Sequence, residues 1–415
     1  MRILFLSGWF PYPPDNGARM RLFHLLRQLG RQHEIALLSF VQTDVLIRDG
    51  PVSQGELDAV NSFCRVLGTV PHRHFQPSRP RALLRLFSPL PRSVLETYSP
   101  EMEALVRKAL HQQPFDLIIA SEIGPGISTP IYVLKVNTIP CVIEDLELSM
   151  IRNKILAEDG WAGRMRHRLT WWKQRRYASH LLRQVEGCTV ASYEERALLQ
   201  SIAPRFESFA VVPNGVDLEA YEGDWGPPEP DALIFPGALT YQANFDAMAF
   251  FIGSIFPRIR AQRPGATLHI TGRTDGVPLH RLPAGDGVVF TGYLKDVRPA
   301  VAQACVCVVP LLTGGGTRLK ILEAMALGTP VVSTSRGAEG LEVTPGEEIL
   351  VADEPAKFAE AVLHLLGDEA LRTRLATNGR RLVRGRYGWD QIGRGFDQFL
   401  HQVVSRTGHQ DAAQC

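Results

Sequence analysis

Two cations stand at the point where a helix is expected to begin. Residues 314–334 read GGGTRLKILEAMALGTPVVST, so three glycines lead through Arg318 and Lys320 into a short apolar helix. The first turn of a helix already carries about +0.5 of a charge, and cations placed there lower its stability. An anion bound between the glycine-rich loop and the helix start would remove that conflict. The pattern therefore predicts an anion site.

A carboxylate follows the two cations on the same expected helix. Glu323 lies about one and a half turns beyond the helix start. Helical side chains tilt toward the N-terminus, so this carboxylate can reach back beside the anion. A carboxylate next to a diphosphate suits the two hydroxyls of a ribose, although an ordinary solvated helix residue is the alternative. Together the loop, the cations and the carboxylate favour a nucleotide diphosphate as the ligand.

The elements around this site alternate between short apolar runs and helical stretches such as 20–29, 246–260 and 319–327. Ser192 and Glu195 form a candidate capping box. The near-continuous apolar character of the runs indicates parallel sheets covered on both faces. Because the pattern occurs twice, we expect an α/β fold with two doubly wound domains. The expected strands are RILFLS, EIALLSF, FDLIIAS, PCVIE, CTVAS and FAVVP, followed by ALIFPG, ATLHITG, GVVFTG, CVCVVP, PVVST and EILVA.

The length and the composition along the chain predict how it divides. A chain of 415 residues is long for one core, so two domains are the natural expectation. The stretch NGVDLEAYEGDWGPPEPD is rich in glycine, proline and acid, and it is predicted to link them. A last helix follows the second sheet, and the final residues are expected to be disordered. The expected parts are residues 1–212, the linker 213–230, residues 231–388, the helix 389–405 and the tail 406–415.

Charge and cysteine usage argue against several classes of protein. The net charge is only +2, which gives no reason to expect a nucleic-acid partner. The six cysteines include no CxxC pair and no cluster with histidine at zinc spacing, so a reduced chain without a structural metal is expected. No apolar run approaches about eighteen residues, and MRILFL is too short for a signal-peptide core. No membrane span is therefore predicted.

Two further strand–helix junctions carry glycine where a backbone could approach an anion closely. The first is PYPPDNGARMR, which contains Gly17, and the second is PGALTYQAN, which contains Gly237 and Asn244. None of the three junctions matches the Walker pattern GxxxxGK[ST], and no GxGxxG follows the first strand. Neither an ATPase nor a dinucleotide site is therefore favoured.

These motifs resemble those of glycosyltransferase family 4 and its relatives. GGGTRLKILEAMALGTPVVSTSRGAEGL is similar to the family's donor-site segment, VVPNGVD to its hinge signature, and TGYLKDVRPAVAQACVCVVPL to the segment that holds the nucleobase. The start, LFLSGWFPYPPDNGARMRLFHLLRQL, resembles the amino-terminal segment of a subset associated with exopolysaccharide clusters. The resemblance covers residues 1–40 and nearly all of 187–395, and it is weak in 45–110 and 145–185.

The resemblance implies the GT-B architecture, in which two Rossmann-like domains face a donor-binding cleft and a final helix returns to the first domain. It implies a nucleotide-sugar glycosyltransferase of the hexosyltransferase type, retaining and metal-independent, with a UDP- or GDP-linked donor and no cofactor. The acceptor would be a glycan or a lipid-linked molecule. The protein would be cytoplasmic, with a peripheral contact at the inner face of an anionic membrane.

The resemblance also implies the site residues. Arg318 and Lys320 are the candidate catalytic residues, because they would neutralise the leaving diphosphate. The candidate donor-binding residues are Gly17, Gly237, Asn244, Arg273, Tyr293, Gly315, Gly316, Thr317 and Glu323.

Three departures from the family pattern bear on this assignment. Many relatives carry two glutamates as E-x7-E, but Gly315 occupies the earlier position here, which leaves the identity of the sugar open. Relatives often place an Arg/Lys pair where this chain has TYQANFD, so the phosphate charge falls more heavily on Arg318 and Lys320. The histidine often found in the first domain is absent, and Glu122 lies near its place.

Two other functions share the same sequence features. A non-hydrolysing nucleotide-sugar 2-epimerase has this architecture, and Glu144 and Asp145 could supply its acid and base. A catalytically silent sugar-nucleotide-binding partner of a larger assembly is the other alternative. The absence of the first glutamate, replaced by Gly315, and of the histidine is compatible with a protein that binds the donor without turnover.

A stretch of the first domain has no acidic residue between Gly160 and Val185. Trp161, Met165, Leu169 and Trp172 keep helical spacing there, while a second apolar set continues on another face, which predicts a bent helix or two helices. Residues 71–93 are also free of acid. Either the aromatic residues are core and the arginines solvated, or the region contacts anionic lipid or a lipid-linked acceptor.

Overall fold

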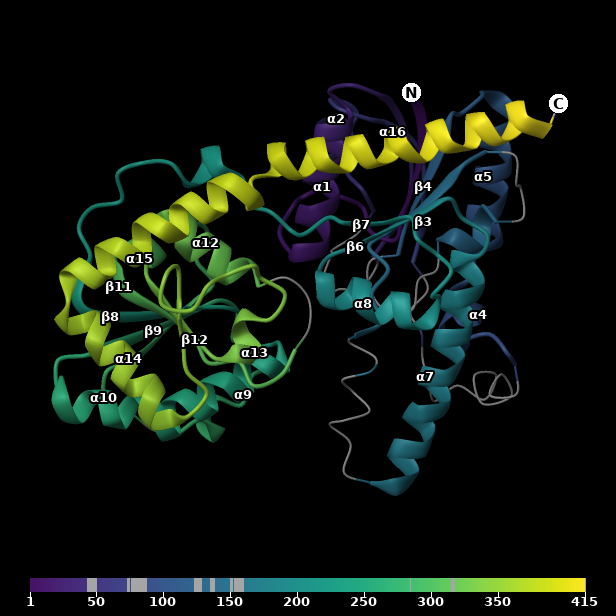
Figure 1. The fold of residues 1–415 in the computed structure, drawn as a ribbon. Coiled ribbons are helices and arrows are strands. Elements are labelled where there is room, and N and C mark those ends of the chain that lie inside the picture. Colours follow the sequence, from purple (N-terminus) through teal and green to yellow (C-terminus); the bar gives the residue numbers. More distant parts are fainter. Residues whose placement is uncertain are drawn as a thin grey trace. The chain divides into compact units, whose positions relative to one another are not determined.

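In the computed structural model the chain divides into two compact units. Unit 1 comprises Met1–Asn214 and Ile392–Cys415, and unit 2 comprises Gly215–Gln391. Each unit has a parallel sheet of its own (Figure 1). The structure describes all residues except 43–50, 73–74, 76–87, 123–128, 135–138, 150–151, 153–159, 284, 315–317 and 415.

Unit 1 is built on seven parallel strands in the order β3-β2-β1-β4-β5-β6-β7. Every residue of β1 and β2 after the first is buried, as expected for apolar strands covered on both faces. The strands are β1 (Arg2–Ser7), β2 (Glu34–Val41), β3 (Arg65–Pro71), β4 (Leu117–Ser121), β5 (Cys141–Glu144), β6 (Gly187–Val190) and β7 (Phe209–Val211).

The sequence prediction missed β3, whose residues read RVLGTVP. Gly68 interrupts its apolar pattern, and the register with β2 shifts between Leu37 and Leu38. The described helices of unit 1 are α1 (Gly17–Leu29), α2 (Gln54–Asn61), α4 (Arg92–Thr97), α5 (Pro100–Gln112), η2 (Pro130–Tyr132), α7 (Trp161–Leu182), α8 (Tyr193–Ile202) and the part of α16 (Trp389–Gln414) from Ile392 onward.

Three local features of unit 1 differ from the expectation. Helix α7 is continuous over its 22 residues, so the alternative of two helices is wrong. Ser192 caps α8 by accepting a hydrogen bond from the backbone of Glu195, but the reciprocal half of the capping box is missing. The Glu195 carboxylate instead accepts the backbone N–H groups of Leu148 and Ser149. Helix α16 continues to Gln414, through the segment for which the sequence predicts a disordered tail.

Unit 2 contains six parallel strands in the order β10-β9-β8-β11-β12-β13. Alternate residues of β8 and β11 face two different core clusters. Phe235 and Val308 belong to one, with α10 and α14, while Ile234 and Val309 belong to the other, with α11 and α12. The strands are β8 (Glu229–Pro236), β9 (Thr267–Thr271), β10 (Val288–Gly292), β11 (Ala304–Val309), β12 (Val331–Ser333) and β13 (Leu350–Val351).

The helix expected over 246–260 is interrupted in the structure. A π-helical turn, η4 (Phe251–Ile255), separates α9 (Gln242–Phe250) from α10 (Phe256–Gln262). Pro257 has no backbone N–H to donate, which explains a break in the regular ladder there. The other helices of unit 2 are η3 (Leu218–Tyr221), η5 (Leu279–Arg281), α11 (Arg298–Ala302), α12 (Leu319–Leu327), α13 (Ser335–Ala338), α14 (Pro355–Gly367), α15 (Glu369–Leu382) and η6 (Val383–Tyr387).

Both units therefore have the doubly wound, Rossmann-like topology that the sequence predicts. In each sheet the chain adds strands outward from a central one and then restarts on its other side. In unit 2 this reversal lies between β8 and β11, which are neighbours in the sheet. Ligands of open α/β sheets bind at the carboxyl ends of strands at such a reversal. The fold thus directs attention to the loops after Pro236 and Val309.

Candidate functional site

Helix α12 begins where the sequence predicts, directly after the loop that follows β11. Arg318 is its N-cap residue and has no side-chain capping bond, and Lys320 lies in the first turn. The helix ends at Gly328, which has a left-handed backbone with φ of 78°. Both predicted cations are therefore at the positive end of the helix, beside the strand reversal of unit 2.

Arg318 is almost fully buried, at 6% exposure. Its Nη2 donates hydrogen bonds to the carbonyl oxygens of Gly314, at 3.0 Å, and Arg336, at 3.3 Å. Gly314 adopts φ of 110°, a conformation that side-chain-bearing residues rarely adopt. The guanidinium is thus oriented by two backbone carbonyls, and the strained glycine allows the loop to supply one of them.

Lys320 occupies a narrow space between three residues. Its Nζ donates to Oδ1 of Asn244 at 2.9 Å and lies 4.0 Å from the ring centroid of Phe235. A Cβ added at Gly237 would stand 2.8 Å from that Nζ, so a larger residue there would displace the ammonium group from its present position. The contact between Lys320 and Asn244 joins α12 to α9 across 76 residues of sequence.

The surroundings of Lys320 change its protonation. Burial lowers the pKa of the ammonium group to about 7, and the nearby charge of Arg318 acts in the same direction. Asn244 can only orient the group, because its side chain is neutral, and its own Nδ2 donates to the carbonyl of Ala238 at 2.8 Å. The site therefore holds a lysine that gains a full positive charge most readily when an anion arrives.

Glu323 lies on the same helix and is not an ordinary solvated residue. Its Oε1 accepts a hydrogen bond from the hydroxyl of Tyr221 at 2.9 Å. Burial raises the pKa of the Glu323 carboxyl, while the Tyr221 hydrogen bond and the charge of Lys320 oppose that rise. Burial and the Glu323 carboxylate together raise the pKa of Tyr221 above its usual range. One carboxylate oxygen is thus held in place, and Oε2 has no hydrogen bond in the described part of the chain.

Tyr221 was not predicted from the sequence. It lies in η3, within the stretch that was predicted to be a linker, and 102 residues separate it from Glu323. The available signal was the pair Leu218 and Tyr221, two large side chains at helical spacing in a linker otherwise rich in glycine, proline and acid. Both pack against the core cluster that contains α12.

Arg273 and Tyr293 follow the next two strands of the sheet, β9 and β10. The guanidinium of Arg273 lies 5.7 Å from the ring centroid of Tyr293, and that ring is 68% exposed. The structure therefore brings this predicted pair together at the carboxyl ends of neighbouring strands. The predicted residues Gly315, Gly316 and Thr317 lie outside the described residues.

Gly17 opens α1 in unit 1, after the carboxyl end of β1. Asn16 is the N-cap of this helix and accepts a hydrogen bond from the backbone N–H of Arg19. Gly17 itself is exposed at the first turn, where backbone N–H groups lack helical partners. The predicted glycine therefore lies at a helix N-terminus of unit 1, and its role toward the donor stays a prediction.

The carboxylates considered for an epimerase lie in a buried network of unit 1. Glu144 is fully buried, with Oε1 2.7 Å from Nε of Arg21 and Oε2 2.7 Å from the hydroxyl of Ser121. Burial raises the pKa of the Glu144 carboxyl. Asp145 adopts φ of 58°, and Arg21 also donates to Asn214 at 3.1 Å. Both carboxylate oxygens of Glu144 thus have partners, in Arg21 of α1 and Ser121 of β4. This arrangement weakens the case for Glu144 as a general acid.

One group of three side chains in the described part of the chain has the composition of a metal site: His33, Asp397 and His401 in unit 1. Nε2 of His33 lies 2.5 Å from Oδ1 of Asp397, and Nε2 of His401 lies 3.7 Å from the same oxygen. Two ligands of a tetrahedral zinc would be about 3.3 Å apart. The short pair fits a hydrogen bond that holds α16 on the segment after α1.

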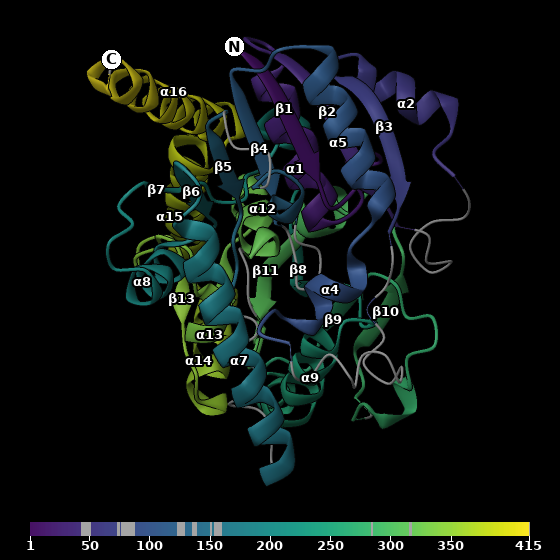
Figure 2. The same ribbon diagram turned by 90° about the vertical axis from the view of Figure 1, so that its right-hand side faces the viewer.

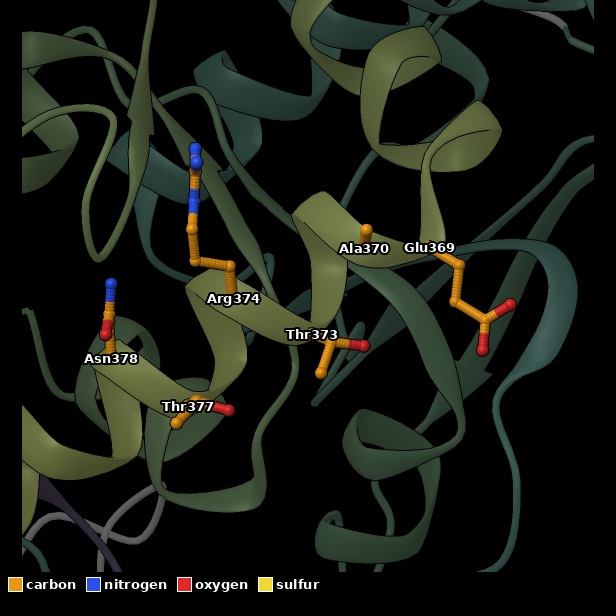
Figure 3. A pocket seen from close by; sticks show the side chains of 6 residues that line it. All are labelled: Glu369, Ala370, Thr373, Arg374, Thr377 and Asn378. Carbon is orange, nitrogen blue, oxygen red and sulfur yellow. The ribbon is translucent and has the colours of Figure 1, made fainter.

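A hollow of about 680 Å³ lies along α15 in unit 2. Figure 3 shows that its lining side chains come from that one helix and spread apart instead of converging. None belongs to the site at α12, and a helix surface of this kind offers no enclosed ligand space. The lining residues are Glu369, Ala370, Thr373, Arg374, Thr377 and Asn378.

The helices that the structure describes include none with the length and apolar character needed to cross a membrane. This finding agrees with the sequence, which has no apolar run of the necessary length.

Comparison with known proteins finds similarity in the region of the unit 2 sheet. Residues 230–368 match the family model described as "Glycosyl transferases group 1". The lipopolysaccharide core biosynthesis glycosyltransferase LpsE of Rhizobium meliloti is 34% identical over 160 residues, which are 35% of this chain and 44% of that protein. The phosphatidyl-myo-inositol mannosyltransferase of Mycolicibacterium smegmatis is 29% identical over 208 residues, 48% of this chain and 52% of that protein. The chain thus spans about half the length of the curated relatives it matches.

Similarity of fold extends over nearly the whole chain. The crystal structure of Anabaena Alr3699/HepE in complex with UDP superimposes with a TM-score of 0.65 at 16% identity, covering 97% of this chain and 100% of that one. The fold is GT-B, as the sequence motifs imply. The family model covers the loops after β8 and β11, where Lys320 and its partners lie.

Proposed function

We propose that this chain, whose residues 230–368 form a domain of the glycosyl transferases group 1 family, transfers a sugar from a nucleotide-diphosphate sugar to a glycan or lipid-linked acceptor. One observation carries the proposal. Lys320, Asn244 and Gly237 meet at the strand reversal of unit 2, with Glu323 one turn further along α12. This arrangement offers a cation to a diphosphate and a carboxylate to the adjoining ribose.

Arg318 and Lys320 would stabilise the leaving group. As the bond from the sugar C1 to the diphosphate oxygen breaks, negative charge develops on that oxygen, and preorganised cations lower the energy of this state. Arg318 is held by the carbonyls of Gly314 and Arg336, so little reorganisation is needed to place its positive charge beside the diphosphate. Lys320 would supply the second charge once the anion raises its pKa.

Transfer would then proceed on the same face of the sugar. A new bond forms between C1 and the acceptor oxygen, and the departing diphosphate oxygen accepts the proton of the acceptor hydroxyl. This route retains the configuration at C1 and needs no carboxylate base, which agrees with the commitment of Glu144 to Arg21. The two cations take the place that a metal ion would have beside the diphosphate, so we propose that no metal and no cofactor is required.

Glu323 would bind the ribose of the donor. Tyr221 holds Oε1, so Oε2 is the oxygen available to accept hydrogen bonds from ribose hydroxyls. Arg273 and Tyr293, at the ends of β9 and β10, would border the nucleobase. UDP- and GDP-linked sugars both suit this arrangement, and the complex of Anabaena HepE with UDP supports a uridine donor.

The names of the relatives bear on the acceptor and the location. A mannosyltransferase that acts on phosphatidyl-myo-inositol and a glycosyltransferase of lipopolysaccharide core biosynthesis both match this chain. They support a hexosyl transfer to a lipid-linked or glycan acceptor for a cell-surface polysaccharide. We place the protein in the cytoplasm, at the inner face of the membrane, where nucleotide sugars and such acceptors meet.

A screen of UDP-, GDP- and ADP-linked sugars by mass spectrometry tests the donor assignment. Binding of at least one nucleotide sugar, followed by slow hydrolysis to free sugar and nucleoside diphosphate, is expected. The variant Arg318→Ala/Lys320→Ala should lose both signals. Conversion of the donor to its 2-epimer would support the epimerase instead, and binding without turnover in the presence of acceptors would support a silent partner protein.

A further inference from the structure

The two ends of helix α7 differ in what surrounds them. Its C-terminal half packs on unit 1, where Tyr177, Ala178, Leu181 and Leu182 are buried in the core. Its N-terminal half extends away from the sheet of unit 1 (Figure 2). The sequence left open whether the aromatic residues of this half are core residues. In the structure four large apolar side chains of this half are exposed.

These four side chains are Trp161, Met165, Leu169 and Trp172, which we call the α7 stripe. Their exposures are 76%, 53%, 42% and 53%. At about 100° per residue they fall within an arc of roughly 80°, and this arc lies nearly opposite the face that is buried in the core. A contiguous apolar stripe that points away from its own domain indicates a binding surface.

The charge on this part of α7 has one sign. No aspartate or glutamate occurs between Gly160 and Val185. Arg164, Arg168 and Arg175 are exposed and follow one border of the stripe by the same helical geometry. Arg176 is also exposed and lies 5.7 Å from the ring centroid of Trp172. Lys173, in contrast, is buried and does not belong to this surface.

We propose that the α7 stripe inserts into the interface of an anionic lipid bilayer, with the helix lying along the surface. Tryptophan and long apolar side chains bordered by arginine suit the boundary between headgroups and acyl chains. The arginines face anionic headgroups, which supply the complementary charge. One narrow stripe is much smaller than the roughly 800 Å² per partner that a stable protein interface buries, whereas a bilayer binds short amphipathic segments.

A membrane contact would bring the protein to a surface that presents lipid-linked acceptors. Only this link to the acceptor rests on the proposed transferase function. Binding to vesicles needs no donor and no turnover. A failed transfer assay and a failed vesicle assay are therefore separate results.

Co-flotation of the full chain with vesicles tests the proposal. The two lipid compositions are phosphatidylcholine alone and phosphatidylcholine mixed with phosphatidylglycerol, each at low and high salt. The wild type should float with the anionic vesicles, less so at high salt, and remain largely free of the neutral ones. Equal binding to both compositions, or none to either, would overturn the proposal.

Two sets of variants locate the contact. Trp161→Ser/Trp172→Ser should weaken vesicle binding by roughly tenfold, whereas Tyr193→Ser, at a 54% exposed tyrosine of α8, should have no effect. Arg164→Glu/Arg168→Glu/Arg175→Glu should weaken binding at least a hundredfold, at about 1 kcal/mol for each cation lost.

The matched control for charge is Arg196→Glu/Arg205→Glu, at two exposed arginines of the same unit, which should bind like the wild type. All variants keep the buried face of α7, and circular dichroism checks their fold. If the control variants lose binding equally, the α7 stripe is not the contact. If the stripe instead joins two copies, the wild type elutes as a dimer that Trp161→Ser/Trp172→Ser converts to a monomer without lipid, and the membrane proposal is rejected.

Discussion

The protonation of Lys320 gives a prediction that depends on the geometry of the site. Burial lowers the pKa of Lys320 from 10.5 to about 7, and the charge of Arg318 acts in the same direction; its hydrogen-bond partner among the described residues is the neutral Asn244. In the unfolded chain the lysine keeps its ordinary pKa. The folded apo protein therefore binds fewer protons than the unfolded chain between about pH 7 and about pH 10.5.

The sign of the effect on stability follows from this difference. The free energy of unfolding should rise with pH across that window, because the unfolded state has the higher proton affinity. A shift of about 3.5 units corresponds to roughly 5 kcal/mol at 1.36 kcal/mol per unit. Below about pH 7 the buried charge lowers stability by that amount. The variant Lys320→Met should lose this contribution to the pH dependence and unfold at a higher denaturant concentration at neutral pH.

Binding of the donor should reverse the shift. The diphosphate of a nucleotide sugar places negative charge beside Lys320 and raises its pKa, so binding above pH 7 takes up a proton. Affinity should then fall by up to about tenfold per pH unit above the apo pKa. A nucleotide sugar is the suitable probe, since its internal diphosphate does not titrate in this range.

Isothermal titration calorimetry in buffers of different ionisation enthalpy measures the proton directly. With UDP-glucose or GDP-mannose at about pH 8, we expect uptake approaching one proton for the wild type and none for Lys320→Met. The control Lys357→Met replaces a lysine that is 68% exposed, and it should behave like the wild type. Donor binding by the wild type without proton uptake would refute the assignment of Lys320 to the diphosphate.

Three further predictions follow from the same site. Arg318→Ala/Lys320→Ala should weaken UDP and GDP binding by more than about tenfold, with apo stability level or higher because charge is removed from a helix start; unchanged affinity would exclude both cations. Glu323→Gln should lower affinity for normal donors more than for 2′- and 3′-deoxy donors, and Tyr221→Phe should do the same more weakly; an equal penalty on all donors would exclude a ribose contact. Transfer activity should persist after dialysis against EDTA, and loss that Mg²⁺ or Mn²⁺ restores would contradict a metal-independent mechanism.

The sequence predicted those features that depend on neighbouring residues. The strands of both sheets are short apolar runs, and ten or more residues of helical pattern separate many of them, so the doubly wound fold could be inferred. The start of α12 was predicted to the residue, because a glycine-rich loop leads into Leu319 at that position. Strand β3 was missed because Gly68 interrupts its pattern.

Contacts over long distances in sequence could not be predicted in the same way. Tyr221 reaches Glu323 across 102 residues, and Lys320 reaches Asn244 across 76. The predicted hydrogen bond from the backbone of Ser192 to the Glu195 carboxylate was wrong for the same reason. The local capping pattern does not reveal that the backbone N–H groups of Leu148 and Ser149 bind this carboxylate. Helical periodicity likewise gave the positions of Trp161 and Trp172 but not whether they face core or solvent.

We propose that the cations and the carboxylate of α12 serve sugar transfer. The most direct test of this proposal is to incubate the purified chain with a nucleotide sugar that it binds and a panel of glycan and lipid-linked acceptors, and to analyse the products by mass spectrometry and NMR. We expect a new glycoside with the anomeric configuration of the donor, formed together with nucleoside diphosphate and absent for Arg318→Ala/Lys320→Ala. An epimerised donor without any glycoside, or a glycoside formed equally well by that variant, would contradict the proposal.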